Sequence, residues 1–156
     1  MDTTPIPAIL ERHGHDPSAL LAILQDIQAV RNYLPRADVE RVARELGVSL
    51  GRVYAMATFY SSFSLKPRGR HTCTVCMGTA CHVRGAPRLV EQVEREFAVA
   101  PGSTSADGEL TLETVNCVGA CALGPLAIVD GEYHGQLDSK KITKVLKALK
   151  GLVRKP

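Results

Sequence analysis

The sequence has no strong excess of charge of one sign. Its 156 residues include 19 Lys and Arg residues against 16 Asp and Glu residues, which leaves a net charge of +3. Proteins that bind nucleic acid through charge present a much larger, clustered basic surface. We therefore expect no nucleic-acid partner.

Long apolar runs are also missing. No window approaches the roughly 18 to 20 apolar residues of a membrane-spanning helix, so no direct insertion into a membrane is expected. The first five residues, MDTTP, contain no basic segment leading into an apolar one, as a secretory signal would. These two observations predict a cytoplasmic protein.

Signatures of nucleotide binding are a third absence. The sequence contains neither G-x-G-x-x-G after a strand-like segment nor the P-loop pattern G-x-x-x-x-G-K-S/T. Both motifs bring a glycine-rich backbone against phosphate groups. The chain is therefore not expected to bind NADH by itself.

Apolar residues recur at helical spacing over roughly the first 60 residues. One predicted helix begins at Asp16 and is stopped by Pro35, the next ends at Gly47, and another is capped by Ser49. A short segment over residues 6–13 adds a further helix. Core packing explains each apolar stripe without a ligand, so we predict a small bundle of three or four helices.

A stretch containing Ser, Pro and Gly over residues 61–69 marks a boundary, after which the apolar period changes. We predict a helical bundle over residues 1–66 and a second domain over residues 67–156. In the second domain, strands are expected over residues 72–76, 110–115, 126–129 and 132–134. A helix is expected over residues 87–97, and a last helix is expected to be capped by Ser139. We interpret this as a thioredoxin-like β-α-β-β-α sheet with helices packed on it, which makes the fold class α+β.

The sequence contains an odd number of cysteines, five, and they fall in two short runs. Cys73, Cys76 and Cys81 form the first run, and Cys117 and Cys121 form the second. Both runs follow predicted parallel strands, so both loops are expected at the same edge of the sheet. The residues between the cysteines are mostly small, which lets backbone N–H groups approach inorganic sulfide. This pattern favours a 2Fe-2S cluster, and hence a one-electron carrier, over a disulfide scaffold.

Two other interpretations of the cysteines remain open from spacing alone. A structural zinc ion could use Cys73, Cys76, Cys117 and Cys121 and leave Cys81 free, which would make the chain an interaction module without a redox role. A thiol–disulfide redox protein could use the C-x-x-C pair at Cys73 and Cys76. The second run of cysteines weakens that interpretation, because a dithiol exchanger does not need it.

Several motifs together resemble a known family. They are C-x4-C at Cys76 and Cys81, C-x3-C at Cys117 and Cys121, and the sequences A-T-F-Y, P-R-G and G-P over residues 57–60, 67–69 and 124–125. This combination is similar to the small 2Fe-2S subunit of the NADH dehydrogenase flavoprotein pair, a family shared with NAD-dependent hydrogenases and formate dehydrogenases. The similarity extends from about residue 20 to the last helix.

The resemblance implies a helical region followed by a thioredoxin-like ferredoxin domain, with cluster ligands at Cys76, Cys81, Cys117 and Cys121. Cys73 departs from the family pattern and is interpreted as a small packed hydrophobe. The resemblance also implies a partner subunit that binds FMN and NAD(P)H, and further iron–sulfur subunits. This chain would then exchange electrons singly with the flavin-bearing partner, and it is not expected to be catalytic alone.

The remaining charged residues and one proline have simpler interpretations. Arg84 is expected to be solvated, although its charge could favour reduction of a nearby cluster. The lysines of the last helix are expected to form its solvated face; they are Lys140, Lys141, Lys144, Lys147 and Lys150. Pro125 precedes a strand at the position where thioredoxin-like folds often have a cis proline.

Overall fold

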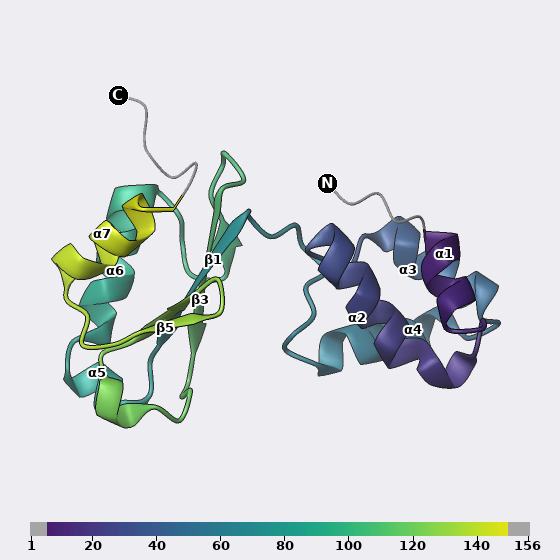
Figure 1. The fold of residues 1–156 in the computed structure, drawn as a ribbon, viewed down its shortest axis with the longest axis horizontal. Helices are drawn as coiled ribbons and strands as arrows, with labels where there is room; N and C mark the ends of the chain where they lie inside the picture. Colours follow the sequence, from purple (N-terminus) through teal and green to yellow (C-terminus); the bar gives the residue numbers. More distant parts are fainter. Residues whose placement is uncertain (1–5, 150–156) are drawn as a thin grey trace. The chain divides into compact units, whose positions relative to one another are not determined.

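The computed structural model describes residues 6–149 and divides into two compact units, residues 1–67 and 68–156. The first unit consists of helices, and the second combines a sheet with helices (Figure 1). Each unit has a hydrophobic core of its own. The two units are therefore described separately.

The N-terminal unit contains the predicted helices. In chain order they are α1 (Ile6–Arg12), the 3-10 turn η1 (Pro17–Ala19), α2 (Leu20–Arg31), α3 (Arg36–Glu45) and α4 (Leu50–Phe59). Residues of the apolar stripes form its core, among them Ile23, Ile27, Val39, Val42 and Val53. The helical interpretation of this region is thus confirmed, except that the helix expected to begin at Asp16 begins with a 3-10 turn.

Local chemistry explains where these helices begin and end. The Asp16 carboxylate accepts a hydrogen bond of 2.8 Å from the backbone N–H of Ser18, and the Ser49 hydroxyl accepts one of 3.3 Å from the N–H of Arg52. Both contacts satisfy donors that a helix leaves free at its start. Gly47, which follows α3, has a φ of +63°, as the predicted left-handed position requires.

The C-terminal unit is built on a mixed sheet with the strand order β2-β3-β1-β4-β5. The strands are β1 (His71–Cys76), β2 (Ser103–Thr104), β3 (Leu110–Val115), β4 (Ala127–Val129) and β5 (Glu132–His134). Strands β1 and β3 are parallel, and the other neighbouring pairs are antiparallel. The parallel pair, on which the predicted position of the cysteines depends, is therefore present.

Helices α5 (Thr79–Val83), α6 (Ala86–Phe97) and α7 (Ser139–Lys147) and the 3-10 turn η2 (Cys121–Leu123) complete this unit. Helices α6 and α7 pack against each other beside the sheet (Figure 1). Their inward residues, including Leu89, Val93, Ile142 and Leu146, are buried with the strands' apolar side chains. The expected α+β architecture is confirmed.

Three details differ from the sequence-based expectations. The structure adds the short strand β2 and the short helix α5. Ser139 is the first residue of α7, whereas the cap is Asp138, which accepts hydrogen bonds from the N–H groups of Lys140 and Lys141 at 2.9 and 2.8 Å. The prediction of Ser139 as the cap is wrong by one residue, because Asp138 has the extended backbone of a cap and Ser139 is already helical.

The lysines of α7 lie where they were expected. Lys140, Lys141, Lys144 and Lys147 are exposed, and Lys147 also pairs with Glu96 of α6. Lys150 lies outside the described residues.

The hairpin between β4 and β5 turns at Asp130 and Gly131, whose φ angles of +50° and +89° are both positive, as the predicted type I′ turn requires. Asp130 also secures the start of β1. Its carboxylate accepts a hydrogen bond of 2.9 Å from the N–H of Thr72 and pairs with the His71 ring at 2.6 Å. Cys76 lies at the opposite end of this strand.

Across residues 6–149, no helix combines the length and the apolar character that crossing a membrane would need.

Candidate metal centre

The register of the parallel strands β1 and β3 places the two cysteine runs at one edge of the sheet. Cys76, the last residue of β1, is aligned with Val115, the last residue of β3. Cys81 follows in α5, while Cys117 and Cys121 follow β3. Parallel strands end at the same edge, so the two runs leave the sheet side by side, as the sequence predicted.

The first run is more ordered than a loop. Gly78 precedes the first turn of α5, and the N–H of His82 donates to the carbonyl of Gly78 at 2.8 Å. This single helical turn carries Cys81 into the hydrophobic core of the unit. Sequence reasoning missed α5, because five residues are too few for a helical period to be visible.

The four cysteines differ sharply in exposure. The side chains of Cys76 and Cys81 are only 2% and 1% exposed, whereas Cys117 and Cys121 are exposed. All four are free thiols. The site therefore has an inner pair of thiols within the hydrophobic core and an outer pair at the surface.

Two glycines allow the cysteine runs to approach each other closely. A Cβ on Gly78 would lie 2.7 Å from the carbonyl oxygen of Asn116 and 3.2 Å from the Cβ of Cys117. A Cβ on Gly124 would lie 3.0 Å from the Sγ of Cys81 and 3.3 Å from the carbonyl oxygen of Cys121. Both spaces are smaller than a side chain requires, so glycine at these positions keeps the two runs together.

The thiol of Cys76 is surrounded by hydrogen-bond donors. Burial is the largest single influence and acts to raise its pKa. The backbone N–H groups of Gly78 and Val118 and the thiols of Cys81 and Cys117 together outweigh burial, and they lower the pKa of Cys76 below the ordinary thiol value. Its thiolate is thus stabilised from both runs.

The pKa of Cys81 is shifted in the opposite direction. Burial raises its pKa, and the neighbouring Cys76 adds to that effect, while the backbone N–H of Leu126 opposes it. In the second run, the N–H of Gly119 donates to the Sγ of Cys117 at 3.3 Å. Backbone N–H groups from several segments are therefore directed at the sulfur atoms, as the small residues in the sequence indicated.

Cys73 lies apart from this group. It is fully buried within β1, where it pairs with Leu112 on one side and Val129 on the other. Its separation of three residues from Cys76 directs the two side chains to opposite faces of the strand. Burial, with a smaller effect of Asp130, raises the pKa of Cys73 to about 12. A thiol of that kind is a poor nucleophile at neutral pH, which argues against a thiol–disulfide pair at Cys73 and Cys76.

The donor set suits an iron–sulfur cluster. Among residues 6–149, no three Cys, His, Asp or Glu side chains converge in a geometry that would hold one ion. A 2Fe-2S core takes four thiolates spread over two irons, which suits two pairs of thiols on two facing segments. The N–H donors around Cys76 and Cys117 suit the negative charge of such a core.

Two further residues complete the surroundings of the site. The peptide bond between Gly124 and Pro125 is cis, as proposed from the sequence. The Arg84 guanidinium donates a hydrogen bond of 2.9 Å to the carbonyl of Cys121. Arg84 is exposed, as expected, and its contact with the second run is an addition that the sequence does not predict.

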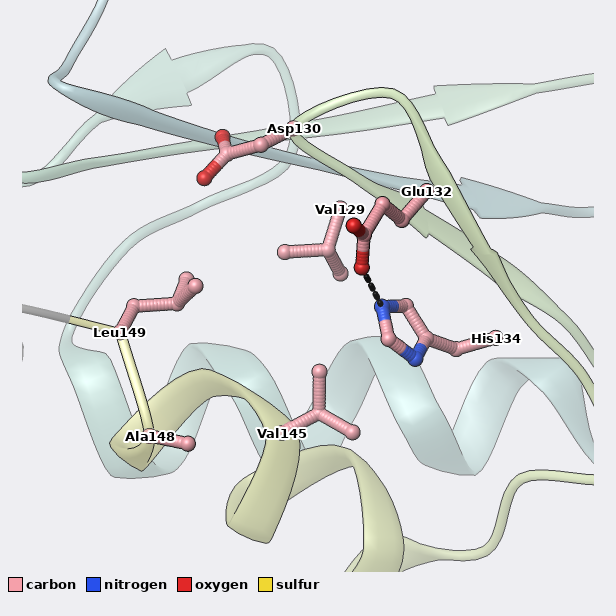
Figure 2. A pocket seen from close by; sticks show the side chains of 7 residues that line it. All are labelled: Val129, Asp130, Glu132, His134, Val145, Ala148 and Leu149. Carbon is pink, nitrogen blue, oxygen red and sulfur yellow. Dashed lines mark ion pairs between the residues drawn. The ribbon is translucent and has the colours of Figure 1, made fainter.

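The C-terminal unit also has a cavity of about 400 Å³ between the β4–β5 hairpin and α7 (Figure 2). Its polar residues are Asp130, Glu132 and His134, and the Glu132 carboxylate lies 4.0 Å from the His134 ring. Among the described residues, no cysteine lines this cavity. It is therefore separate from the thiol group.

Comparison with known proteins identifies the family. The family model of the thioredoxin-like 2Fe-2S ferredoxins matches residues 6–150. The chain belongs to this family. Thioredoxin-like 2Fe-2S ferredoxins carry a 2Fe-2S cluster, so the family and the thiol arrangement agree on the cofactor.

Two relatives of this ferredoxin are similar over most of their length. The chain is 33% identical over 141 residues to the NADP-reducing hydrogenase subunit HndA of Solidesulfovibrio fructosivorans, covering 90% of this chain and 80% of that one. It is 34% identical over 149 residues to an NADH-quinone oxidoreductase subunit of Rhizobium meliloti (strain 1021), covering 96% and 89%.

A solved structure shows the same fold. An NAD+-reducing NiFe-hydrogenase in the air-oxidised state superposes with a TM-score of 0.73 at 24% identity. The match covers 87% of this chain but 23% of that chain. At this identity, the comparison supports the arrangement of the ferredoxin's helices and strands.

Proposed function

We propose that the chain is the one-electron carrier subunit of an NAD(P)H-linked oxidoreductase complex, and that Cys76, Cys81, Cys117 and Cys121 hold its 2Fe-2S cluster. The observation that carries this proposal is the position of the four thiols on two segments at the end of two parallel strands. Family membership supports the choice of cluster.

The residues of the site have distinct tasks in this function. When bound, a 2Fe-2S cluster accepts and donates one electron at a time. Cys76 and Cys81 hold it against the hydrophobic core, where water is excluded. Backbone N–H groups of Gly78, Val118 and Gly119 offset the negative charge on the thiolates.

The outer pair of cysteines indicates where electrons enter and leave. Cys117 and Cys121 border an open hollow of about 600 Å³, which Gly78 and Thr79 also line. This hollow gives a partner protein access to the edge of the site without any rearrangement of the core. Electrons would cross between partner and cluster at this surface.

The expected partner is a subunit that binds FMN and NAD(P)H, with further iron–sulfur subunits in the same complex. The names of the relatives support a complex, because both are subunits of larger enzymes, a hydrogenase and an NADH-quinone oxidoreductase. The partner's flavin would divide the two electrons of a hydride into single transfers. We place this complex in the cytoplasm.

Metal and sulfide analysis of anaerobically purified protein tests the proposal. We expect about two irons and two acid-labile sulfides per chain, with visible absorption that dithionite bleaches. A preparation with one zinc ion and no visible colour would refute the cluster and favour the structural zinc module. If the cluster is present, the proteins that co-purify with the chain would identify the complex.

A further inference from the structure

Arg84 connects the two cysteine runs. It lies just beyond α5, three residues after Cys81, and its backbone N–H donates to the carbonyl of Ala80. Its side chain reaches across to the second run, where the Nη1 atom lies 2.9 Å from the carbonyl oxygen of Cys121 and 3.4 Å from that of Gly124. One side chain therefore fixes the outer cysteine run to the helical turn that carries Cys81.

The Arg84 guanidinium and the Cys81 sulfur both border Gly124. A Cβ placed on Gly124 would lie 3.0 Å from the Sγ of Cys81 and 3.6 Å from the Nη1 of Arg84. Arg84 also lines the open hollow that Cys117 and Cys121 border. Among the described residues that line this hollow, Arg84 is the only one with a charged side chain.

The charge of Arg84 is not balanced by a carboxylate. Two other arginines of this unit form ion pairs, Arg68 with Glu113 at 3.1 Å and Arg70 with Glu109 at 3.6 Å. Within residues 6–149, Arg84 has no ion-pair partner, and its hydrogen bonds go to neutral carbonyl groups. Its positive charge is therefore not neutralised by an ion pair, although solvent at this exposed position screens it.

We propose that Arg84 is a positioning residue that holds the Cys121 run against Cys81 and raises the reduction potential of the centre. The proposal rests on the cluster ligation proposed above. Reduction adds one electron to the thiolate-bound centre, which becomes more negative by one charge. A fixed positive charge at the rim stabilises that state more than the oxidised one.

The test is a redox titration of the purified holoprotein with dithionite as the electron source, followed by visible absorption and electron paramagnetic resonance. Arg84→Gln removes the charge but retains an amide that can donate to the Cys121 carbonyl. We expect unchanged iron and sulfide content and an approximately tenfold lower ratio of reduced to oxidised centres at a fixed potential. For a one-electron couple, tenfold corresponds to about 59 mV.

Arg84→Lys and Arg88→Gln are the matched variants. Arg84→Lys keeps the charge, so its potential should remain close to the wild-type value. Arg88→Gln removes an equal charge from an exposed position in α6 that does not line the hollow, and it should shift the potential much less. High salt should reduce the difference between Arg84→Gln and wild type, because the guanidinium is reached by solvent.

The outcomes separate this proposal from the function on which it depends. Wild-type protein without iron and sulfide would refute the cluster proposal. A normal cluster in the wild type with equal potentials in wild type and Arg84→Gln would refute the role of Arg84. If Arg84→Gln loses its cluster, Arg84→Lys decides: a retained cluster at the wild-type potential supports the proposal, and a lowered potential overturns it.

Discussion

Replacing Gly78 by alanine should separate the two cysteine runs. The backbone at Gly78, with φ −57° and ψ 154°, suits alanine, so the substitution introduces no conformational strain. The added Cβ would instead lie 2.7 Å from the Asn116 carbonyl oxygen and 3.2 Å from the Cβ of Cys117. Because the nearest atom belongs to the backbone, the second run must move away from α5.

The cost of this displacement should resemble that of other overpacked interiors, about 1 to 3 kcal/mol. With an m-value of about 2 kcal/mol/M in urea, the unfolding midpoint of the C-terminal unit should fall by roughly 0.5 to 1.5 M. Iron and sulfide content should fall with it, since Cys117 moves relative to Cys76. Circular dichroism in urea and metal analysis measure the two effects separately.

Gly51→Ala is the matched control. Gly51 lies in α4, and apart from its chain neighbours and its own helical backbone, no atom of the described residues lies within 4 Å of the position its Cβ would take. Alanine there should stabilise the helical unit by roughly 0.5 to 1 kcal/mol and leave iron content unchanged. Wild-type stability and full iron content in Gly78→Ala would show that the runs are not held together by this contact.

Three further predictions concern single side chains. Cys73→Ser should retain the cluster and Cys76→Ser should lose most of it; the reverse result in iron analysis would move the first ligand to Cys73. In protein stripped of metal, iodoacetamide at pH 8 should label the exposed Cys117 but not the buried Cys73, because burial raises the pKa of Cys73 to about 12. Peptide mass spectrometry that finds both residues labelled would contradict the structure. The backbone N–H of Lys141 is the largest influence on Asp138, and it lowers the pKa of that carboxyl group. The cap therefore stabilises α7 above about pH 4, and this stabilisation is lost as the pH falls below the folded pKa. Asp138→Ala should lose less stability on acidification than wild type, and parallel pH profiles of the two proteins would refute that contribution.

Most of the fold could be predicted because the spacing of apolar residues within a long helix or strand indicates the type of element. The helices of the first unit, the strands around Cys76 and Val115, and the turn at Asp130 and Gly131 each follow from apolar spacing or turn chemistry in a few adjacent residues. The alignment of the parallel strands then placed both cysteine runs at one edge. The elements themselves needed only local information, whereas the position of the two runs also needed the pairing of two strands that are distant in the chain.

The features that were missed depend on short segments or on distant partners. Helix α5 and the two-residue strand β2 are too short to show a period. Asp138 and Ser139 are both good capping residues, and only the backbone conformation distinguishes them. The carbonyl groups that Arg84 contacts lie 37 and 40 residues further along the chain, so no local pattern could reveal them.

The parallel pairing of β1 and β3 also determines which changes in chain length the site tolerates. The register from His71 to Cys76 against Leu110 to Val115 fixes the two cysteine runs in space, whatever number of residues connects them. The exposed turn at Asp107 and Gly108 lies within that connection, outside any strand. Insertions at this turn would lengthen the sequence between Cys81 and Cys117 without separating their sulfur atoms. The pairing of the two strands, and not the length of this connection, therefore holds the two runs beside each other.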